Sequence, residues 1–190
     1  MQHTMRTLHG LPSQSEAFLD AAMSIVAGNC TVTTGMGKAG HIAQKVSSTL
    51  CSFGIKSCYL DPAAASHGDV GIVGPGDVVL AFSTSGKTRE VIETVQLAQE
   101  LGASTTIAIT SHPDGEIRQY SQIVLDMGIL KEAGHLNIAP TTSTTVMMVM
   151  ADFLVSIAAE IKGATMADYA LRHHSGYLGK KSREIIQQQR

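Results

Sequence analysis

Residues 78–102 read VVLAFSTSGKTREVIETVQLAQELG, and this stretch decides the fold. The continuous apolar run Val78–Phe82 is typical of a strand that is buried on both faces. The segment Ser83–Gly86 interrupts the run, and the periodic apolar residues of Thr88–Leu101 predict a helix that Gly102 closes. A buried strand that leads through a short polar loop into a helix is the building unit of a parallel α/β sheet.

The same alternation continues on both sides of this unit. Further strands are predicted at Cys30–Thr34, Ser57–Leu60, Thr105–Thr110 and Ile123–Met127, and further helices at Ser13–Ala27, Lys38–Phe53, Asp114–Tyr120, Thr141–Lys162 and Ala167–Arg172. A capping box is expected at Ser13–Glu16, loops at Asp61–Ser66 and Gly128–Ala139, and either a peripheral helix or a frayed tail at Lys180–Arg190. We therefore expect an α/β fold, a three-layer αβα sandwich around a five-stranded parallel sheet joined by right-handed crossovers.

The composition is that of an ordinary globular domain. The chain has 190 residues, of which 44% are hydrophobic and 16% charged, and its net charge is −2. Neither a linker nor an internal repeat is evident, so we expect one domain over residues 1–190, with an N-terminal helix within 1–29 and a peripheral tail at 180–190. The slightly acidic balance, without a basic block, argues against nucleic acid or an anionic membrane as the main partner.

Cysteine and hydropathy patterns indicate a cytoplasmic protein. The three cysteines, Cys30, Cys51 and Cys58, form no C-x-x-C pair, so reduced thiols are expected rather than disulfides or a zinc finger. The histidines lack metal-ligand spacing, so no metal site is predicted. The apolar stretch Val146–Ile161 is interrupted by polar side chains, and Met1–Pro12 lacks the apolar centre of a signal peptide, so neither a membrane span nor a leader is expected.

The STSGKT loop is the first candidate for chemistry, since parallel sheets bind ligands where strands end and loops begin. The hydroxyls of Ser83, Ser85 and Thr88 lie beside free backbone N–H groups at the positive end of a helix. Such a loop suits a phosphate or a carboxylate. The alternative is an ordinary serine-rich turn in which Thr88 caps the helix.

The segment GMGKAG, residues 35–40, repeats this arrangement one strand earlier. It has neither the P-loop spacing nor the complete dinucleotide fingerprint, so no nucleotide cofactor is predicted. Lys38 would reach a bound anion as a point charge. The alternative is a solvated lysine, but the first turn of a helix prefers anions, which favours the functional interpretation. His67, Glu132 and His173 are isolated polar residues of predicted loops, and each taken alone is more often a cap or a surface group.

Six segments taken together carry a resemblance. In chain order they read GMGKAGHIAQK, HGDVG, STSGKTREV, KEA, APTTSTT and ALRHHSGYLGKK, over residues 35–181. This series resembles the SIS (sugar isomerase) domain, and within that family the arabinose-5-phosphate isomerases that supply the pathway to 3-deoxy-D-manno-octulosonate (Kdo). The resemblance implies a homotetramer that interconverts D-ribulose 5-phosphate and D-arabinose 5-phosphate without a cofactor, here in a single-domain form that lacks the CBS modules of many relatives.

The resemblance also implies roles for individual residues. The catalytic residues would be Lys38, Glu90, Glu132 and His173, and the substrate or its phosphate would be bound by Gly37, His67, Ser83, Thr84, Ser85 and Thr88. Asp61 and Ala64 replace a histidine and a glutamate of the family, which places sensitivity to an inhibitory metal in question. His173-His-Ser-Gly176 replaces the usual HPGG, which bears on the conformation of that loop.

Isomerisation through a cis-enediol needs a carbon base, an oxyanion stabiliser and a phosphate anchor. Glu132 is the expected base, a role that would be helped if burial raised its pKa toward neutrality, and Lys38 would stabilise the enediolate. His173 would move hydroxyl protons or open a cyclic substrate. Glu90 would orient Lys38 or share the role of base. Two alternatives remain, a non-catalytic sugar-phosphate sensor and an SIS isomerase for another ketose or aldose phosphate.

The helix predicted from Thr141 is apolar on nearly all sides, with Met147, Met148, Val149 and Met150 in one turn. A helix of this kind is buried, either inside the protomer or between subunits, and the sequence leaves both possibilities open. If subunits meet along it, His173 enters a neighbour's active site, and the sites lie near subunit interfaces.

Overall fold

The computed structural model describes residues 9–188, and within them five strands form one parallel sheet in the order β2-β1-β3-β4-β5. The strands are β1 (Thr31–Gly35), β2 (Ser57–Leu60), β3 (Val78–Phe82), β4 (Thr105–Thr110) and β5 (Ile123–Asp126). The α-helices are α2 (Ser15–Ala27), α3 (Lys38–Ser52), α4 (Pro62–Ala65), α5 (Arg89–Glu100), α6 (Thr142–Ile161), α7 (Met166–Arg172) and α8 (Gly176–Gln188). The 3₁₀ turns are η1 (Leu11–Gln14), η2 (Asp69–Ile72) and η3 (Glu116–Tyr120).

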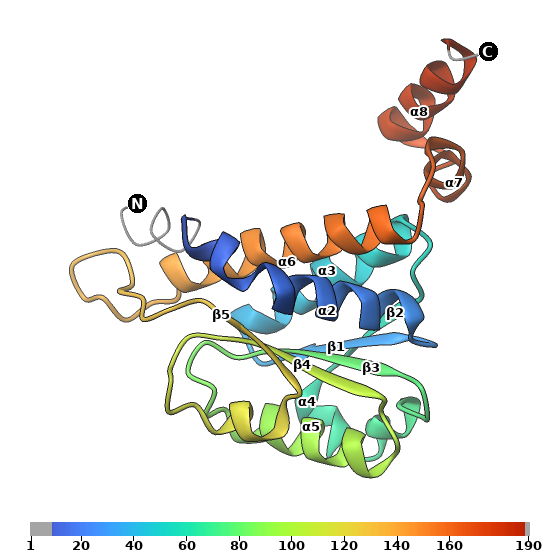
Figure 1. Ribbon diagram of the computed structural model, residues 1–190. Helices are drawn as coiled ribbons and strands as arrows, with labels where there is room; N and C mark the ends of the chain where they lie inside the picture. The colour runs from blue at the N-terminus through green and yellow to red at the C-terminus, as the bar shows by residue number, and fades with distance from the viewer. Residues whose placement is uncertain (1–8, 189–190) are drawn as a thin grey trace.

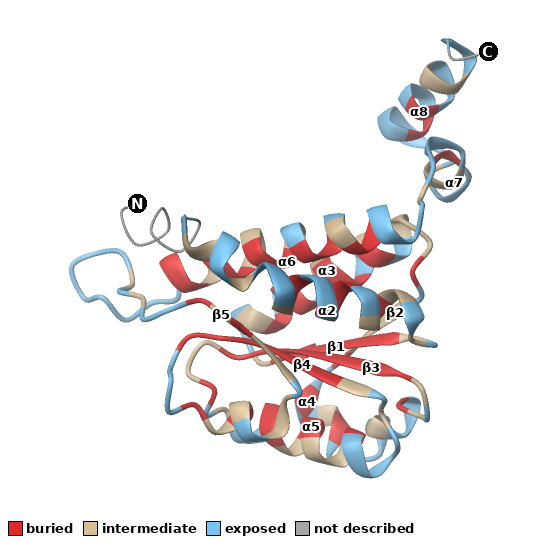
Figure 2. Cartoon of the chain, viewed as in Figure 1, coloured by how far each residue is buried: buried red, intermediate tan, exposed pale blue. Residues whose placement is uncertain are grey.

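Helices cover both faces of the sheet, as Figure 1 shows: α2, α3 and α6 lie on one face, and α4 and α5 on the other. Strand β3 explains why two layers form. Its side chains alternate, so that Val78, Leu80 and Phe82 belong to the core under α2, α3 and α6 while Val79 and Ala81 belong to the core over α5. All five are buried, as Figure 2 shows for the whole strand. The predicted three-layer α/β architecture is confirmed.

Helix α6 is chiefly a core helix of the protomer. Its ten buried residues, among them Met147 and Met150, pack toward α2 and α3. By length and composition alone α6 would suffice to cross a membrane, and it is the one such helix among the described residues. Its outer face still exposes Phe153 and Ile161, so part of its apolar surface is left uncovered in the single protomer.

The start of α2 differs from prediction, because the expected capping box at Ser13–Glu16 is wrong. Ser13 lies in η1, and its hydroxyl donates to the Gly10 carbonyl (2.6 Å). The N-cap is Gln14, whose amide bonds instead to both backbone groups of Asp126 at the end of β5 (2.9 and 2.7 Å). A tertiary contact has therefore replaced the local cap.

The segment predicted as a loop before His67 contains the short helix α4. Asp61 caps it, accepting a hydrogen bond from the Ala63 N–H (2.9 Å), and Pro62 occupies the first helical position, where its fixed φ favours a helix.

For the C-terminal tail the sequence left open a peripheral helix or a frayed end, and helix α8 confirms the helix. Residues 1–8 of the predicted N-terminal segment and the tail residues 189–190 lie outside the described residues.

Helices α7 and α8, residues 166–188, form an arm that leaves the body at the C-terminal end of α6 (Figure 1). The arm touches the body near the end of α3, where the rings of Phe53 and Tyr169 are 6.0 Å apart. Loop 127–141 precedes α6 at the helix's opposite end. The 20 residues of α6 correspond to about 30 Å, so the arm and this loop lie far apart within one protomer.

Candidate functional site

The sheet register brings together the loops that follow β1, β3 and β4. Gly35 pairs with Phe82, and Phe82 pairs with Ile109, so these strands end at the same edge of the sheet. The polar segments after the three strands therefore meet, as expected for the carboxyl edge of a parallel sheet. Loop 127–141 follows the neighbouring strand β5 and completes the group.

The loop Ser83–Thr88 after β3 is held by its own hydroxyl groups. The Ser83 hydroxyl accepts from the Gly86 N–H (3.1 Å) and lies 3.2 Å from the Thr88 hydroxyl, and the Ser85 hydroxyl accepts from the Lys87 N–H (3.2 Å). Thr88 occupies the N-cap position, but its side chain forms no capping bond to α5. The first-turn N–H groups of α5, which have no acceptor within the helix, are therefore not capped by the Thr88 side chain.

Two glycines shape these loops. Gly37 precedes Lys38 with φ +60°, a left-handed conformation that favours glycine, and the turn lets Lys38 begin α3 at the site. Gly86 lies so close to the next loop that an added Cβ would come 2.9 Å from the Cα of Gly115. Lys38 itself is exposed, so its amine is available to a ligand.

Glu132 lies at the other wall, at the N-terminus of α6. Its Oε2 accepts hydrogen bonds from the N–H groups of Thr141 (2.9 Å) and Ser143 (3.1 Å) and from the Thr141 hydroxyl (3.2 Å). Burial alone would raise the pKa of Glu132, but the hydrogen bonds from Ser143 and Thr141 outweigh it and lower the pKa below its ordinary value. The pKa of Glu132 therefore does not rise toward neutrality, and the side chain is held as a carboxylate.

These groups line one cavity of about 300 Å³. Its walls include six of the predicted site residues, Lys38, Ser83, Thr84, Ser85, Thr88 and Glu132, together with His112, Ser143, Thr144 and several apolar side chains. His112 was not predicted. The only sequence signal for it is its position two residues beyond a buried strand, where an exposed histidine is unremarkable.

Four predicted site residues are not in the cavity lining of the single protomer. Gly37 adjoins it through the turn, whereas Glu90 is exposed on α5 and His67 is exposed after α4. His173 lies against the far end of α3: its ring stacks on Tyr169 (4.0 Å between centroids), and its Nε2 is 3.4 Å from the Ser52 hydroxyl. Along α3, Ser52 is about 21 Å from Lys38.

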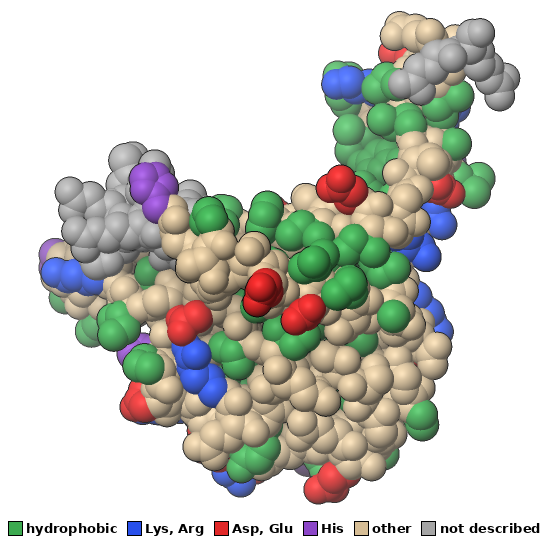
Figure 3. All heavy atoms as spheres, in the orientation of Figure 1, with side chains coloured by type: hydrophobic (Ala, Val, Ile, Leu, Met, Phe, Trp, Pro, Cys, Tyr) green, Lys and Arg blue, Asp and Glu red, His purple; other side chains and the backbone are tan. Residues whose placement is uncertain are grey.

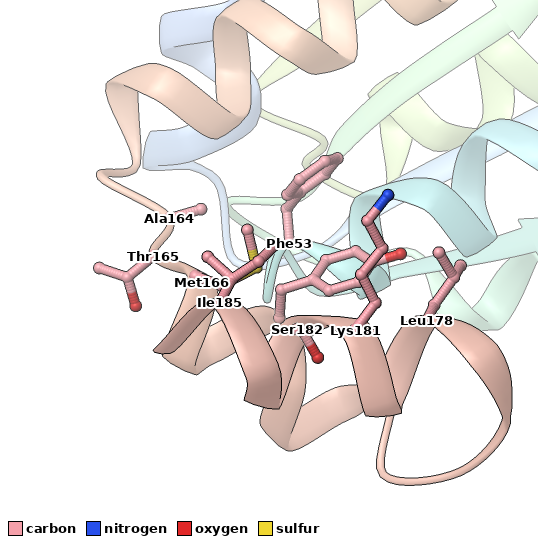
Figure 4. Close-up of a pocket in the computed structure, with 9 residues that line it drawn as sticks. Phe53, Ala164, Thr165, Met166, Leu178, Lys181, Ser182 and Ile185 are labelled. Carbon is pink, nitrogen blue, oxygen red and sulfur yellow. The ribbon is translucent and has the colours of Figure 1, made fainter. Parts of the chain in front are cut away.

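A second cavity, of about 440 Å³, lies between the arm and Phe53. Figure 4 shows Phe53 facing side chains of α8, among them Leu178 and Ile185, with the Lys181 amine beside them. Its lining is mainly apolar and offers no glycine-rich loop or first helix turn to an anion. The chemistry of a sugar phosphate therefore fits the smaller cavity.

Among the described residues no group of three or more His, Cys, Asp or Glu side chains could hold a metal ion, and the three cysteines are free thiols. Cys30 and Cys58 are neighbours across β1 and β2. Burial first, then the adjacent Cys58 sulfur, raises the pKa of Cys30 to about 12. Cys30 is thus an unreactive thiol at neutral pH.

Known proteins match most of the chain. The model of the SIS domain family matches residues 29–157, which include β1 to β5 and most of α6. The arabinose 5-phosphate isomerase KdsD of Pseudomonas aeruginosa is 41% identical over 165 residues, which cover 86% of this chain and 50% of that protein. The protein of the same name from Escherichia coli K12 is 39% identical over 79% of this chain and 45% of its own length. The chain thus spans about half the length of these curated relatives.

Two solved structures share the fold over most of their length. A putative phosphosugar isomerase involved in capsule formation from Bacteroides fragilis has a TM-score of 0.81 and 43% identity, covering 85% of this chain and 88% of that one. The c3406 protein of E. coli CFT073, solved in complex with arabinose 5-phosphate, has a TM-score of 0.81 and 28% identity. The match covers 91% of this chain and 93% of that one.

Proposed function

Because the chain belongs to the SIS domain family, we propose that it is an aldose–ketose isomerase that interconverts D-arabinose 5-phosphate and D-ribulose 5-phosphate through a cis-enediol. The observation that carries this proposal is the single cavity in which an anion-binding loop, Lys38 and the ionised Glu132 meet. The curated relatives named arabinose 5-phosphate isomerase support the choice of substrate. A sensor of sugar phosphates would need the loop but no carboxylate opposite it.

The phosphate is anchored by the Ser83–Thr88 loop. The hydroxyls of Ser85 and Thr88 and the first-turn N–H groups of α5 all present donors, and the positive end of the helix favours the phosphate charge. This binding energy holds the reacting carbons in place, since it comes from a group that does not itself react.

The proton between C1 and C2 is transferred by Glu132. Because Glu132 is ionised at neutral pH, it is ready to accept the proton without first losing its own. Its low pKa makes it a weak base, so the developing charge on the substrate oxygen has to be stabilised. Lys38, on the opposite wall, provides a positive charge for that oxygen. Glu90 and His67, both outside the cavity lining, stay predictions as a base partner and a sugar contact.

His173 acts from a second copy of the chain. Within its own protomer it is fixed against Ser52, about 21 Å along α3 from Lys38, so it cannot share that cavity. Two exposed apolar surfaces fit the arrangement. Loop 127–141 beside the cavity exposes Ile129, Leu136 and Ile138, and the arm exposes Leu171, Tyr177 and Leu178 around His173.

The body also exposes an apolar strip, visible as green side chains near the arm in Figure 3. It consists of Leu19 and Met23 on α2 and Phe153 and Ile161 on α6. Together with the arm, this strip provides the contacts of a homotetramer whose active sites lie near subunit interfaces. We place the protein in the cytoplasm, where its thiols stay reduced, and its product in Kdo biosynthesis.

Glu132→Gln tests the mechanism. The amide preserves shape but cannot take the proton, so kcat should fall about 100-fold or more while substrate still binds. Exchange of the substrate C2 proton with deuterated solvent should vanish as well. Glu90→Gln is the matched control. Exchange that persists in Glu132→Gln and disappears in Glu90→Gln would reverse the two roles. Exchange unaffected in both would show that neither carboxylate is the base, and no exchange with the wild-type protein would favour the sensor.

A further inference from the structure

We propose that His112 is a phosphate-binding residue of the cavity, whose imidazole donates a hydrogen bond to the substrate phosphate beside the Ser83–Thr88 loop. The inference rests on the proposed function, because it assigns a partner to the same sugar phosphate. His112 lines the cavity together with Ser83, Thr84, Ser85 and Thr88, and its side chain is exposed to it.

The position of His112 is tied to the anion-binding loop by backbone contacts. It lies two residues beyond β4, which pairs directly with β3. The N–H of the preceding residue, Ser111, donates to the Thr84 carbonyl (3.0 Å), and the Ile117 N–H donates to the Gly86 carbonyl (2.9 Å). The loop that carries His112 and the loop that anchors the phosphate are therefore one hydrogen-bonded unit.

The backbone of His112 is also fixed from its other side. Its carbonyl accepts hydrogen bonds from the Arg118 Nε (2.8 Å) and from the Gly115 N–H (3.1 Å). Arg118 is anchored in turn by its ion pair with Asp126 (2.7 Å). A histidine on such a braced loop loses little backbone freedom on binding, which favours a binding role.

The charge balance of the cavity calls for a further phosphate ligand besides Lys38. A phosphate monoester carries about −1.5 to −2 charges at pH 7. Among the cavity residues Lys38 is positive and Glu132 negative, so Lys38 alone leaves the phosphate charge largely unpaired. Lys87, although it belongs to the anion-binding loop, is outside the lining and donates to Asp114 instead (2.5 Å). His112 is the remaining nitrogen base that lines the cavity.

The other charged side chains near His112 have partners of their own. Asp114, two residues away, pairs with Lys87 (2.5 Å), which lowers the pKa of that carboxyl. Arg89, at the start of α5, pairs with Glu93 (2.7 Å) and lies 3.9 Å from Glu116. These ion pairs leave the imidazole of His112 available to a bound phosphate.

His112→Ala tests the proposal. A hydrogen bond to a charged group is lost, so KM for arabinose 5-phosphate should rise about tenfold or more, with kcat within about twofold of wild type. Inorganic phosphate, tested as a competitive inhibitor and by calorimetry, should lose the same factor. His112→Gln keeps a donor and should recover part of it. His41→Ala, an exposed histidine of α3 outside the cavity lining, is the matched control.

Calorimetry with inorganic phosphate separates this proposal from the proposed function. If the wild-type protein binds phosphate but does not isomerise the pentose phosphates, the proposed function is wrong. The role of His112 can then still be tested by comparing the phosphate affinities of the wild-type protein and His112→Ala. Unchanged phosphate binding in a folded His112→Ala protein overturns the proposal. So does a variant that loses affinity for arabinose 5-phosphate but not for phosphate, because His112 would then contact the sugar.

Discussion

Glu132 shows how three hydrogen bonds decide the protonation state of one side chain. Its partial burial favours the neutral acid, whereas the donors at the start of α6 favour the carboxylate and prevail. A helix N-terminus adds to this effect, because its partial positive charge attracts an anion. The same contacts hold the carboxylate in one place, so the proposed base is well positioned although its low pKa makes it a weak base.

Removing one of these donors should move the pH profile. Thr141→Val deletes the hydroxyl that donates to Glu132 (3.2 Å), so the pKa of Glu132 rises and the acid limb of kcat/KM shifts to higher pH. Because the folded-state pKa is lowered, the stability from these bonds is present above the unfolded pKa and lost as pH falls through the folded value. Thr145→Ala, whose hydroxyl donates to the Thr141 carbonyl, is the control. An identical acid limb in Thr141→Val and the control would show that the Thr141 hydroxyl does not set the pKa of the base.

At the scale of elements, close packing between α3 and the sheet positions Lys38. Gly40, in the first turn of α3, is buried, and an added Cβ would come 2.5 Å from the Gly35 carbonyl oxygen and 2.9 Å from the Tyr59 hydroxyl. The Tyr59 hydroxyl donates to that same carbonyl (3.0 Å). The helix therefore begins close to β1, and this placement brings Lys38, its first residue, to the cavity.

Gly40→Ala should destabilise the protein although alanine is the better helix former. The clash is with backbone, so α3 has to shift, and overpacking of this kind costs about 1–3 kcal/mol against a propensity gain of about 1 kcal/mol. We expect a lower Tm in thermal unfolding and a reduced kcat from the displaced Lys38. Gly71→Ala, with no atom near its Cβ position, should leave both unchanged. A Tm for Gly40→Ala at or above wild type would show that α3 can move freely.

At the scale of the whole molecule, the protomer has chemistry at one end of α6 and a histidine-bearing arm at the other. The apolar outer faces of the arm and of α2 and α6 are uncovered in the single chain (Figures 2 and 3). The proposed homotetramer covers them and brings His173 to a neighbouring cavity. In this proposal, oligomerisation is a condition of activity as well as a means of burying surface.

Mixed oligomers test this arrangement. Lys38→Met and His173→Asn should each be nearly inactive alone. Coexpressed in equal amounts they should recover about a quarter of wild-type activity, because random assembly gives one site in four an intact Lys38 and an intact His173 from different chains. If His173 served its own protomer, every chain would carry one lesion and mixing would restore nothing. His174→Asn, paired with Lys38→Met, is the control and should exceed that level.

The sequence alone determined the architecture and much of the cavity. Buried runs such as Val78–Phe82 and the glycine-bearing loops after them are local signals, and parallel topology then gathers those loops at one edge. Tertiary structure alone decided the low pKa of Glu132, the inclusion of His112 and the distance of His173 from Lys38. These depend on contacts between segments remote in the chain, which no local pattern encodes.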